Sequence, residues 1–196
     1  MADVRRVPPG RAGRLWLSSR LRSAQRAGTL LDRRLRILRI EQQRFDLLVG
    51  RSGPEWQAAA ADAQVWLARA AALGGSRGID LAAIPETASV EIEWATVMGL
   101  RYPAGTTLHT ASPDVASYPV SAALLEARRA HERALAAAVV HAAALTAQRV
   151  VQREIASTRQ RLRAITDRWT PRLEAALADL ERRIEETERE ETVRLR

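Results

Sequence analysis

Apolar and small side chains recur along the first part of the chain at alternating steps of four and three residues. This spacing is that of the a and d positions of a coiled coil, and it continues for more than four heptads. It predicts one long helix with a single apolar stripe, the first seam. Gly28 lies on this seam, where its missing side chain predicts close approach of a partner backbone. The first seam consists of Leu17, Leu21, Ala24, Gly28, Leu31, Leu35, Leu38, Gln42, Phe45 and Val49.

The sequence Gly-Arg-Ser-Gly-Pro at residues 50–54 predicts a stop or kink in this helix. Pro54 has no amide hydrogen to donate, and its ring disfavours helix at the residue before it. Alanine-rich helical sequence then resumes over residues 55–73, and the glycine-rich residues 74–78 end it.

Residues 79–119 differ in character, because they gain proline, threonine and serine. Val90, Ile92 and Trp94 alternate with glutamates, which is the period of a strand with one apolar face. Gly99 and Gly105 then supply turn residues. The pattern predicts a small β-hairpin within residues 88–110.

A second helical pattern runs from Ser121, a predicted helix N-cap, to the end of the chain. The steps from Ile165 to Trp169 and from Trp169 to Leu173 are both four residues, a stutter that relaxes left-handed supercoiling. Pro171 lies inside the stutter and predicts a helix kink. The second seam comprises Ile155, Thr158, Leu162, Ile165, Trp169, Leu173, Leu180 and Ile184.

These elements divide the chain into three segments. Residues 1–73 form an N-terminal helical arm with the break near 50–54, residues 74–119 form a loop and β-hairpin insert, and residues 120–196 form a C-terminal helical arm. Two long arms that flank a short insert pack most economically against each other. We therefore expect a mainly α fold, a long antiparallel two-helix coiled coil with a small β-hairpin-containing insert at its turn end.

Composition restricts the chemistry of the chain. All 31 basic residues are arginine, so the lysine of a phosphate-binding P-loop and that of a Schiff-base enzyme are both missing. There is no cysteine, and the three histidines have no metal-ligand spacing. We therefore expect no catalytic residue, no cofactor site, no metal site and no direct nucleotide binding.

The net charge is +8, and the basic surplus is concentrated in residues 1–50. Such a surplus is compatible with an arginine-rich coiled-coil scaffold or a nucleic-acid-binding protein. No aromatic platform accompanies the arginines, so nucleic acid is not the expected partner. No apolar run approaches the roughly 20 residues of a membrane span, and the first residues lead into prolines rather than a signal-peptide core. The expected location is the cytoplasm.

Both ends of the chain carry a family resemblance. The early residues are Pro8-Pro9-Gly10-Arg11 followed by a helix with Arg20-Leu21, residues 24–28 and Leu30-Leu31. The late residues are 158–165 (Thr-Arg-Gln-Arg-Leu-Arg-Ala-Ile), Pro171-Arg172-Leu173 and 188–195 (Glu-Arg-Glu-Glu-Thr-Val-Arg-Leu). In this order and at this distance, the two ends resemble the D subunit of the V-type and archaeal-type rotary ATPases. The match covers about the first 45 and the last 45 residues well, and the break at residues 50–54 departs from the usual continuous first helix.

The resemblance implies a non-catalytic central rotor shaft that transmits torque between an ATP-hydrolysing or ATP-synthesising head and a membrane ring that translocates protons or sodium ions. The implied partners are the catalytic and non-catalytic subunits of the head, a small companion stalk subunit and the socket subunit of the membrane ring. The chain would then be cytoplasmic and peripheral to the membrane through the complex. Candidate contacts with acidic loops of the head are Arg20, Arg22, Arg26, Arg159, Arg161 and Arg163.

Overall fold

The computed structural model describes residues 7–81, 87–110 and 121–195. These residues form two units. Unit 1 contains the chain up to Ile37 and from Ile155 onward, and unit 2 contains Leu38–Glu154. The long helices contribute to both units, so each unit is described by itself.

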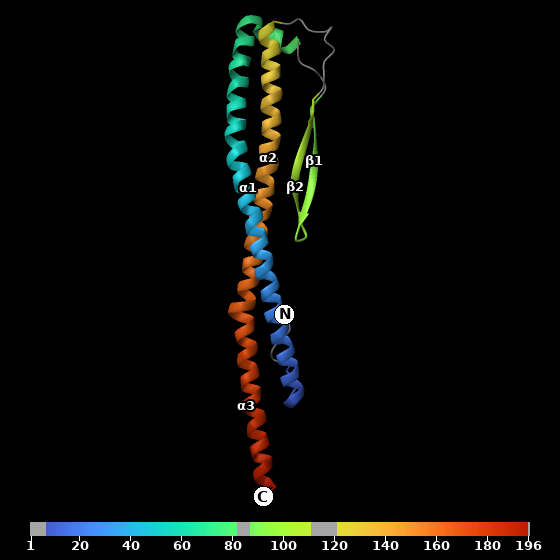
Figure 1. Cartoon of the computed structure of the whole chain (residues 1–196), viewed down its shortest axis with the longest axis vertical. Helices are drawn as coiled ribbons and strands as arrows, with labels where there is room; N and C mark the ends of the chain where they lie inside the picture. Colours follow the sequence, from blue (N-terminus) through green and yellow to red (C-terminus); the bar gives the residue numbers. More distant parts are fainter. Residues whose placement is uncertain (1–6, 82–86, 111–120, 196) are drawn as a thin grey trace. The chain divides into compact units, whose positions relative to one another are not determined.

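The first helix, α1 (Gly10–Leu81), does not stop at residues 50–54. The predicted stop is therefore not found: α1 continues through this stretch (Figure 1), and Pro54 lies inside the helix. A proline frees the carbonyl group four residues before it, here that of Gly50. Because Gly50 and Pro54 both lie on the exposed face of α1, water can hydrate the freed carbonyl group and the helix continues.

Helical geometry in α1 is interrupted at Gly75, whose φ of 65° and ψ of 177° lie outside the helical region. A positive φ is easily adopted only by glycine. The regular part of α1 therefore ends where the glycine-rich residues 74–78 predicted an end, and a short helical stretch follows it.

The β-hairpin lies within the predicted range. Strand β1 (Ser89–Val97) pairs in antiparallel fashion with β2 (Leu100–His109), with Val90 opposite Leu108 and Val97 opposite Leu100. Met98 and Gly99 form the two-residue turn, and both have positive φ, 49° and 79°, as a type I′ turn requires. A register shift between Glu93 and Trp94 marks a bulge.

The second helical arm begins with α2 (Ala122–Arg163). Ser121 caps this helix as predicted, because the Leu124 amide donates a hydrogen bond to its side-chain oxygen at 3.3 Å. After α2 come a π-helical segment, η3 (Ala164–Trp169), and α3 (Thr170–Arg194).

The π-helical segment coincides with the predicted stutter. The Thr170 amide donates to the carbonyl of Ile165, an i→i−5 bond, so this turn holds one residue more than an α-helical turn. The extra residue keeps Ile165, Trp169 and Leu173 on one face although they are spaced by four. Pro171 then falls in the first turn of α3, where its missing amide hydrogen costs little.

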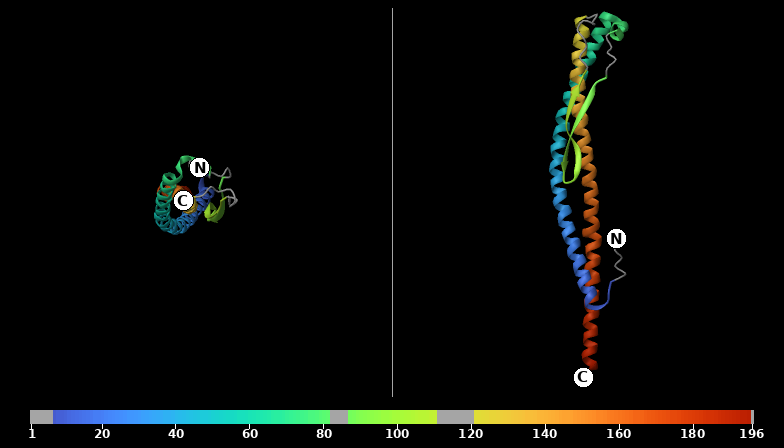
Figure 2. Two further views of the ribbon diagram at one scale, coloured as in Figure 1. Left: turned by 90° about the horizontal axis from the view of Figure 1, so that it is seen from above. Right: turned by 90° about the vertical axis from the view of Figure 1, so that its right-hand side faces the viewer.

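The expected fold class is confirmed: a long helix, a two-stranded antiparallel hairpin and a second long helical arm follow one another (Figures 1 and 2). Within unit 1, the early residues of α1 run antiparallel to η3 and α3, because Arg11 contacts Glu188 while Gly28 lies opposite Ile165. Within unit 2, the later part of α1 runs antiparallel to α2, because Asp46 contacts Gln148 while Asp62 contacts Arg133.

Candidate functional site

Unit 1 is held together by a core of large apolar side chains. Leu17 and Leu173 are 1% and 0% exposed, and together with Ala24 they form the buried centre. Trp169 packs against this centre, as the second seam predicted. Trp16, which lies beside the first seam, also packs against it while the guanidinium group of Arg20 lies 5.3 Å from its ring centroid. Other side chains around the centre are Val7, Leu21, Ile165, Ala176, Leu177 and Leu180.

The predicted seam positions lie on one face in the structure. In α1, Leu17, Gly28, Leu35, Leu38 and Phe45 are buried, whereas Leu21 and Leu31 are half-buried. In the second arm, Ile155 and Leu173 are buried, and the half-buried members are Leu162, Ile165, Trp169, Leu180 and Ile184.

The tightest glycine in unit 1 is Gly13, which the sequence pattern did not single out. A side-chain carbon at Gly13 would lie 2.0 Å from the carbonyl oxygen of Pro8 and 3.0 Å from Leu180. The same carbon at Gly28 would meet only the side chains of Ile165 and Thr166, at 4.0 Å. The expected close backbone approach at Gly28 is therefore not found, and at Gly13 the packing leaves no room for a side chain.

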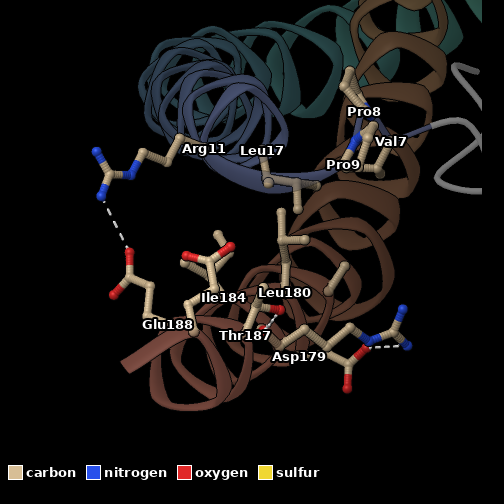
Figure 3. A pocket seen from close by; sticks show the side chains of 14 residues that line it. Val7, Pro8, Pro9, Arg11, Leu17, Asp179, Leu180, Ile184, Thr187 and Glu188 are labelled. Carbon is tan, nitrogen blue, oxygen red and sulfur yellow. Dashed lines mark hydrogen bonds and ion pairs between the residues drawn. The ribbon is translucent and has the colours of Figure 1, made fainter. Parts of the chain in front are cut away.

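A groove of about 900 Å³ opens between the start of α1 and α3 (Figure 3). Leu17, Leu180 and Ile184 provide its apolar lining, and Pro8 and Pro9 stand at one side. The ion pair between Arg11 and Glu188, 3.1 Å long, spans α1 and α3 at the groove. Both partners are largely exposed, so this pair adds little stability.

All six arginines proposed to contact the head belong to unit 1, and all are exposed. Arg20, Arg22 and Arg26 are carried by α1, and Arg159, Arg161 and Arg163 by α2. Each of the six is therefore accessible to a partner of unit 1, while their contact with the head remains a proposal.

Unit 2 has a different seam, made mainly of alanine. Its buried residues include Ala63 and Ala70 of α1 and Ala123, Ala127 and Ala130 of α2. These buried positions of α1 continue the first seam without a change of phase. The seam passes from Val49 through residues 52, 56, 59, 63, 66 and 70, again in steps of three and four.

A polar cluster interrupts this alanine seam. Ser52 is 7% exposed, and its hydroxyl oxygen lies 2.9 Å from Nδ1 of His141 in α2. The indole of Trp56 stacks on the imidazole, with ring centroids 5.6 Å apart and an interplanar angle of 15°. Gly53 leaves room for the imidazole, since a side-chain carbon there would lie 3.3 Å from Cε1.

The hairpin contacts α1 through one aromatic pair within unit 2. Tyr102 of β2 is 6% exposed and meets Phe45 edge to face, with centroids 5.1 Å apart. Val90, Ile92 and Trp94, which predicted the strand, remain 43–50% exposed. The apolar alternation therefore predicted strand β1 correctly, whereas Tyr102, which contacts Phe45 of α1, lies on strand β2.

Exposed apolar side chains are frequent on the helices of unit 2. Leu47 of α1 is 75% exposed, and Val140 of α2 is 52% exposed. Singly scattered exposed leucines are ordinary in soluble proteins, and only a contiguous apolar patch marks an interaction site. The others on these helices include Ile40, Leu48, Val65, Leu67, Leu73, Leu125 and Leu135.

The helical segment Ala122–Arg194 also contains an 18-residue window with a mean hydropathy of 1.5. Length and composition alone would let such a segment cross a membrane, although the sequence pattern had indicated no such run. This is weak evidence for a membrane span. The alanine-rich seam face of α2 packs against α1 in unit 2.

Among residues 7–81, 87–110 and 121–195, no group of three or more histidine, aspartate or glutamate side chains could hold a metal ion. The histidines in this part of the chain have separate surroundings. His131 contacts the carbonyl of Ala127, His141 contacts Ser52, and His109 faces Glu91 at 3.7 Å. Each histidine in this part of the chain therefore takes part in its own local contact.

Comparison with known proteins agrees with this architecture. No curated protein matches the chain significantly. The model of one protein family, the D subunit of ATP synthase, matches residues 15–196 and so covers both helical arms and the hairpin. The chain belongs to this family of ATP synthase D subunits and is a stalk subunit of a rotary ATPase.

Proposed function

We propose that this chain is the central rotor shaft of a V/A-type rotary ATPase and transmits torque between the head and the membrane ion-translocating ring. The observation that carries the proposal is the antiparallel pairing of the two helical arms in both units. Paired helices resist twisting and shear better than a single helix, because side chains interlock along the seam. The chain itself is then non-catalytic and lies in the cytoplasm, peripheral to the membrane through the complex.

The head is the proposed partner of unit 1. Its exposed arginines, including Arg20, Arg22 and Arg26 on α1, would attract acidic loops of the catalytic and non-catalytic head subunits. Such rim charges act mainly on the rate of association and on specificity.

The companion stalk subunit is the proposed partner of unit 2. Leu47 and Val140 are more than half exposed there, and burial of such side chains supplies the free energy of association. The remaining proposed partner, the socket subunit of the membrane ring, completes the connection to the membrane.

The test is co-purification of the tagged chain with its complex. We expect one copy of the chain for three copies of each larger nucleotide-binding subunit. Recovery of the chain without those subunits, or in three copies per head, would contradict the shaft assignment.

Charge reversal tests the head contact. Arg20, Arg22 and Arg26 are changed together to glutamate, and the matched control reverses the exposed Arg51, Arg69 and Arg129 of unit 2. We expect the first variant to lose head assembly or coupled ATPase activity while the control keeps both. Equal assembly of the two variants would refute the contact but leave the shaft assignment standing.

A further inference from the structure

The side chain of His141 occupies a specific hole in the seam of unit 2. In a coiled coil, each seam side chain enters a hole formed by four residues of the facing helix. Residues 49, 52, 53 and 56 of α1 have the spacing of such a hole, and three of them meet the imidazole. Ser52 contacts Nδ1, Trp56 stacks on the ring, and Gly53 leaves the space beside Cε1.

The seam on one side of this hole is nearly uniform. Ala63 and Ala70 of α1 face a region of α2 whose buried residues are also alanines. If α2 slid by one heptad along α1, these alanines would again meet alanines. Small repeated side chains therefore distinguish poorly between registers.

The polar cluster does distinguish them. A slip of one heptad in one direction would place His141 in a hole of residues 56, 59, 60 and 63, where alanines replace Ser52 and Gly53. The half-buried imidazole would lose its hydroxyl partner and face alanine methyl groups, so the contact with Ser52 favours the observed register. A slip in the other direction would put Phe45 where Ser52 stands and Asp46 where Gly53 stands, which fills the space for the ring.

We propose that His141, seated between Ser52, Gly53 and Trp56, fixes the axial register of α2 on α1 in unit 2. A single polar seam residue is known to specify register in coiled coils. Two other polar contacts join the same helices, the ion pair between Asp62 and Arg133 and the hydrogen bond that Gln148 donates to Asp46. Neither replaces the cluster, because both contacts are exposed and exposed pairs contribute little. The proposal concerns the packing of the chain itself and stands independently of its role in a rotary complex.

Distance measurements between two spin labels test the register on the full-length chain. The chain has no cysteine, so Glu55→Cys and Arg129→Cys place labels at two exposed sites, one on each helix of unit 2. A slip of one heptad moves the labels by about 10 Å along the helix axis. Pulsed electron paramagnetic resonance resolves a shift of this size.

The test variant combines Ser52→Ala with His141→Ala, and the matched control combines Asp62→Ala with Arg133→Ala. We expect one label distance in the parent chain and in the control, and a second, resolved distance in the test variant. The axial slip of about 10 Å adds to a lateral separation that stays fixed, so it changes the measured distance by less than the slip itself. Circular dichroism checks that helix content is kept. If the test variant loses helix content, the distance is measured instead in the single variant Ser52→Ala, which removes the hydrogen bond without enlarging the side chain. A single unchanged distance in the variant that keeps its helices would overturn the proposal.

Discussion

Replacing Leu173 by alanine tests whether the core of unit 1 holds the two ends of the chain together. Leu173 is fully buried and lies against Leu17 and Ala24 at the centre of that core. Leu173→Ala removes three carbon atoms from an apolar site, which costs about 2.4 kcal/mol in transfer free energy at about 0.8 kcal/mol per carbon. The cavity left behind adds to this loss, so we expect the free energy of unfolding to fall by about 3 to 4 kcal/mol.

The assay is urea unfolding at 25 °C, followed by circular dichroism and by tryptophan fluorescence. Trp16 and Trp169 pack against the altered core, and replacing Trp56, Trp66 and Trp94 of unit 2 by phenylalanine in every variant makes the emission report unit 1. The matched control is Leu15→Ala in α1, because Leu15 is 66% exposed and its truncation is expected to cost less than about 0.5 kcal/mol. If the free energies of unfolding of the Leu173→Ala and Leu15→Ala variants differ by less than about 1 kcal/mol, Leu173 does not hold this core. In the double variant Leu17→Ala with Leu173→Ala, the loss of unfolding free energy should differ from the sum of the losses in the two single variants. The reason is that the two side chains share one cluster.

Three further changes test other parts of the fold. Pro171→Ala should keep the i→i−5 bond from Thr170 to Ile165, because the extra residue of the π turn, rather than the proline, keeps Leu173 in the core; a crystal structure with an α-helical turn there would refute this explanation. Ser121→Ala should lower the free energy of unfolding by about 1 kcal/mol through loss of the cap of α2, measured by the same urea titration. Tyr102→Ala should increase amide hydrogen exchange throughout β1 and β2, because an isolated two-stranded hairpin is marginally stable; unchanged exchange would mean that the hairpin does not depend on its contact with α1.

The heptad pattern predicted the helices well where seam residues are large. The large apolar members of the seam end at Val49, and the next members include Ser52 and several alanines, which are common on surfaces as well. Their step of three and four was present in the sequence, and the small size of the residues concealed it. Pro54 predicts a stop or kink unless the seam is known to continue past it. The continued seam places Pro54 and Gly50 on the exposed face, where water can hydrate the freed carbonyl of Gly50.

Local geometry was harder to predict than the fold class. The stutter between Ile165 and Leu173 predicted a disturbance of the helix at the right place, but spacing alone does not say whether the chain bends or forms a π turn. The contacts of Gly13 with Pro8 and of Ser52 with His141 join residues from turns or from separate helices. Such contacts depend on which faces meet, and one sequence carries no direct signal of that.

The alanine seam of unit 2 has a mechanical consequence. The distance between two packed helices depends on the side chains at their contact, so helices that meet through Ala63, Ala70, Ala127 and Ala130 can lie closer than helices that meet through leucines. The torsional stiffness of a joined pair rises with the distance of each helix from the common axis. If the chain transmits torque as proposed, this alanine-lined stretch would be the part of its unit that twists most for a given torque.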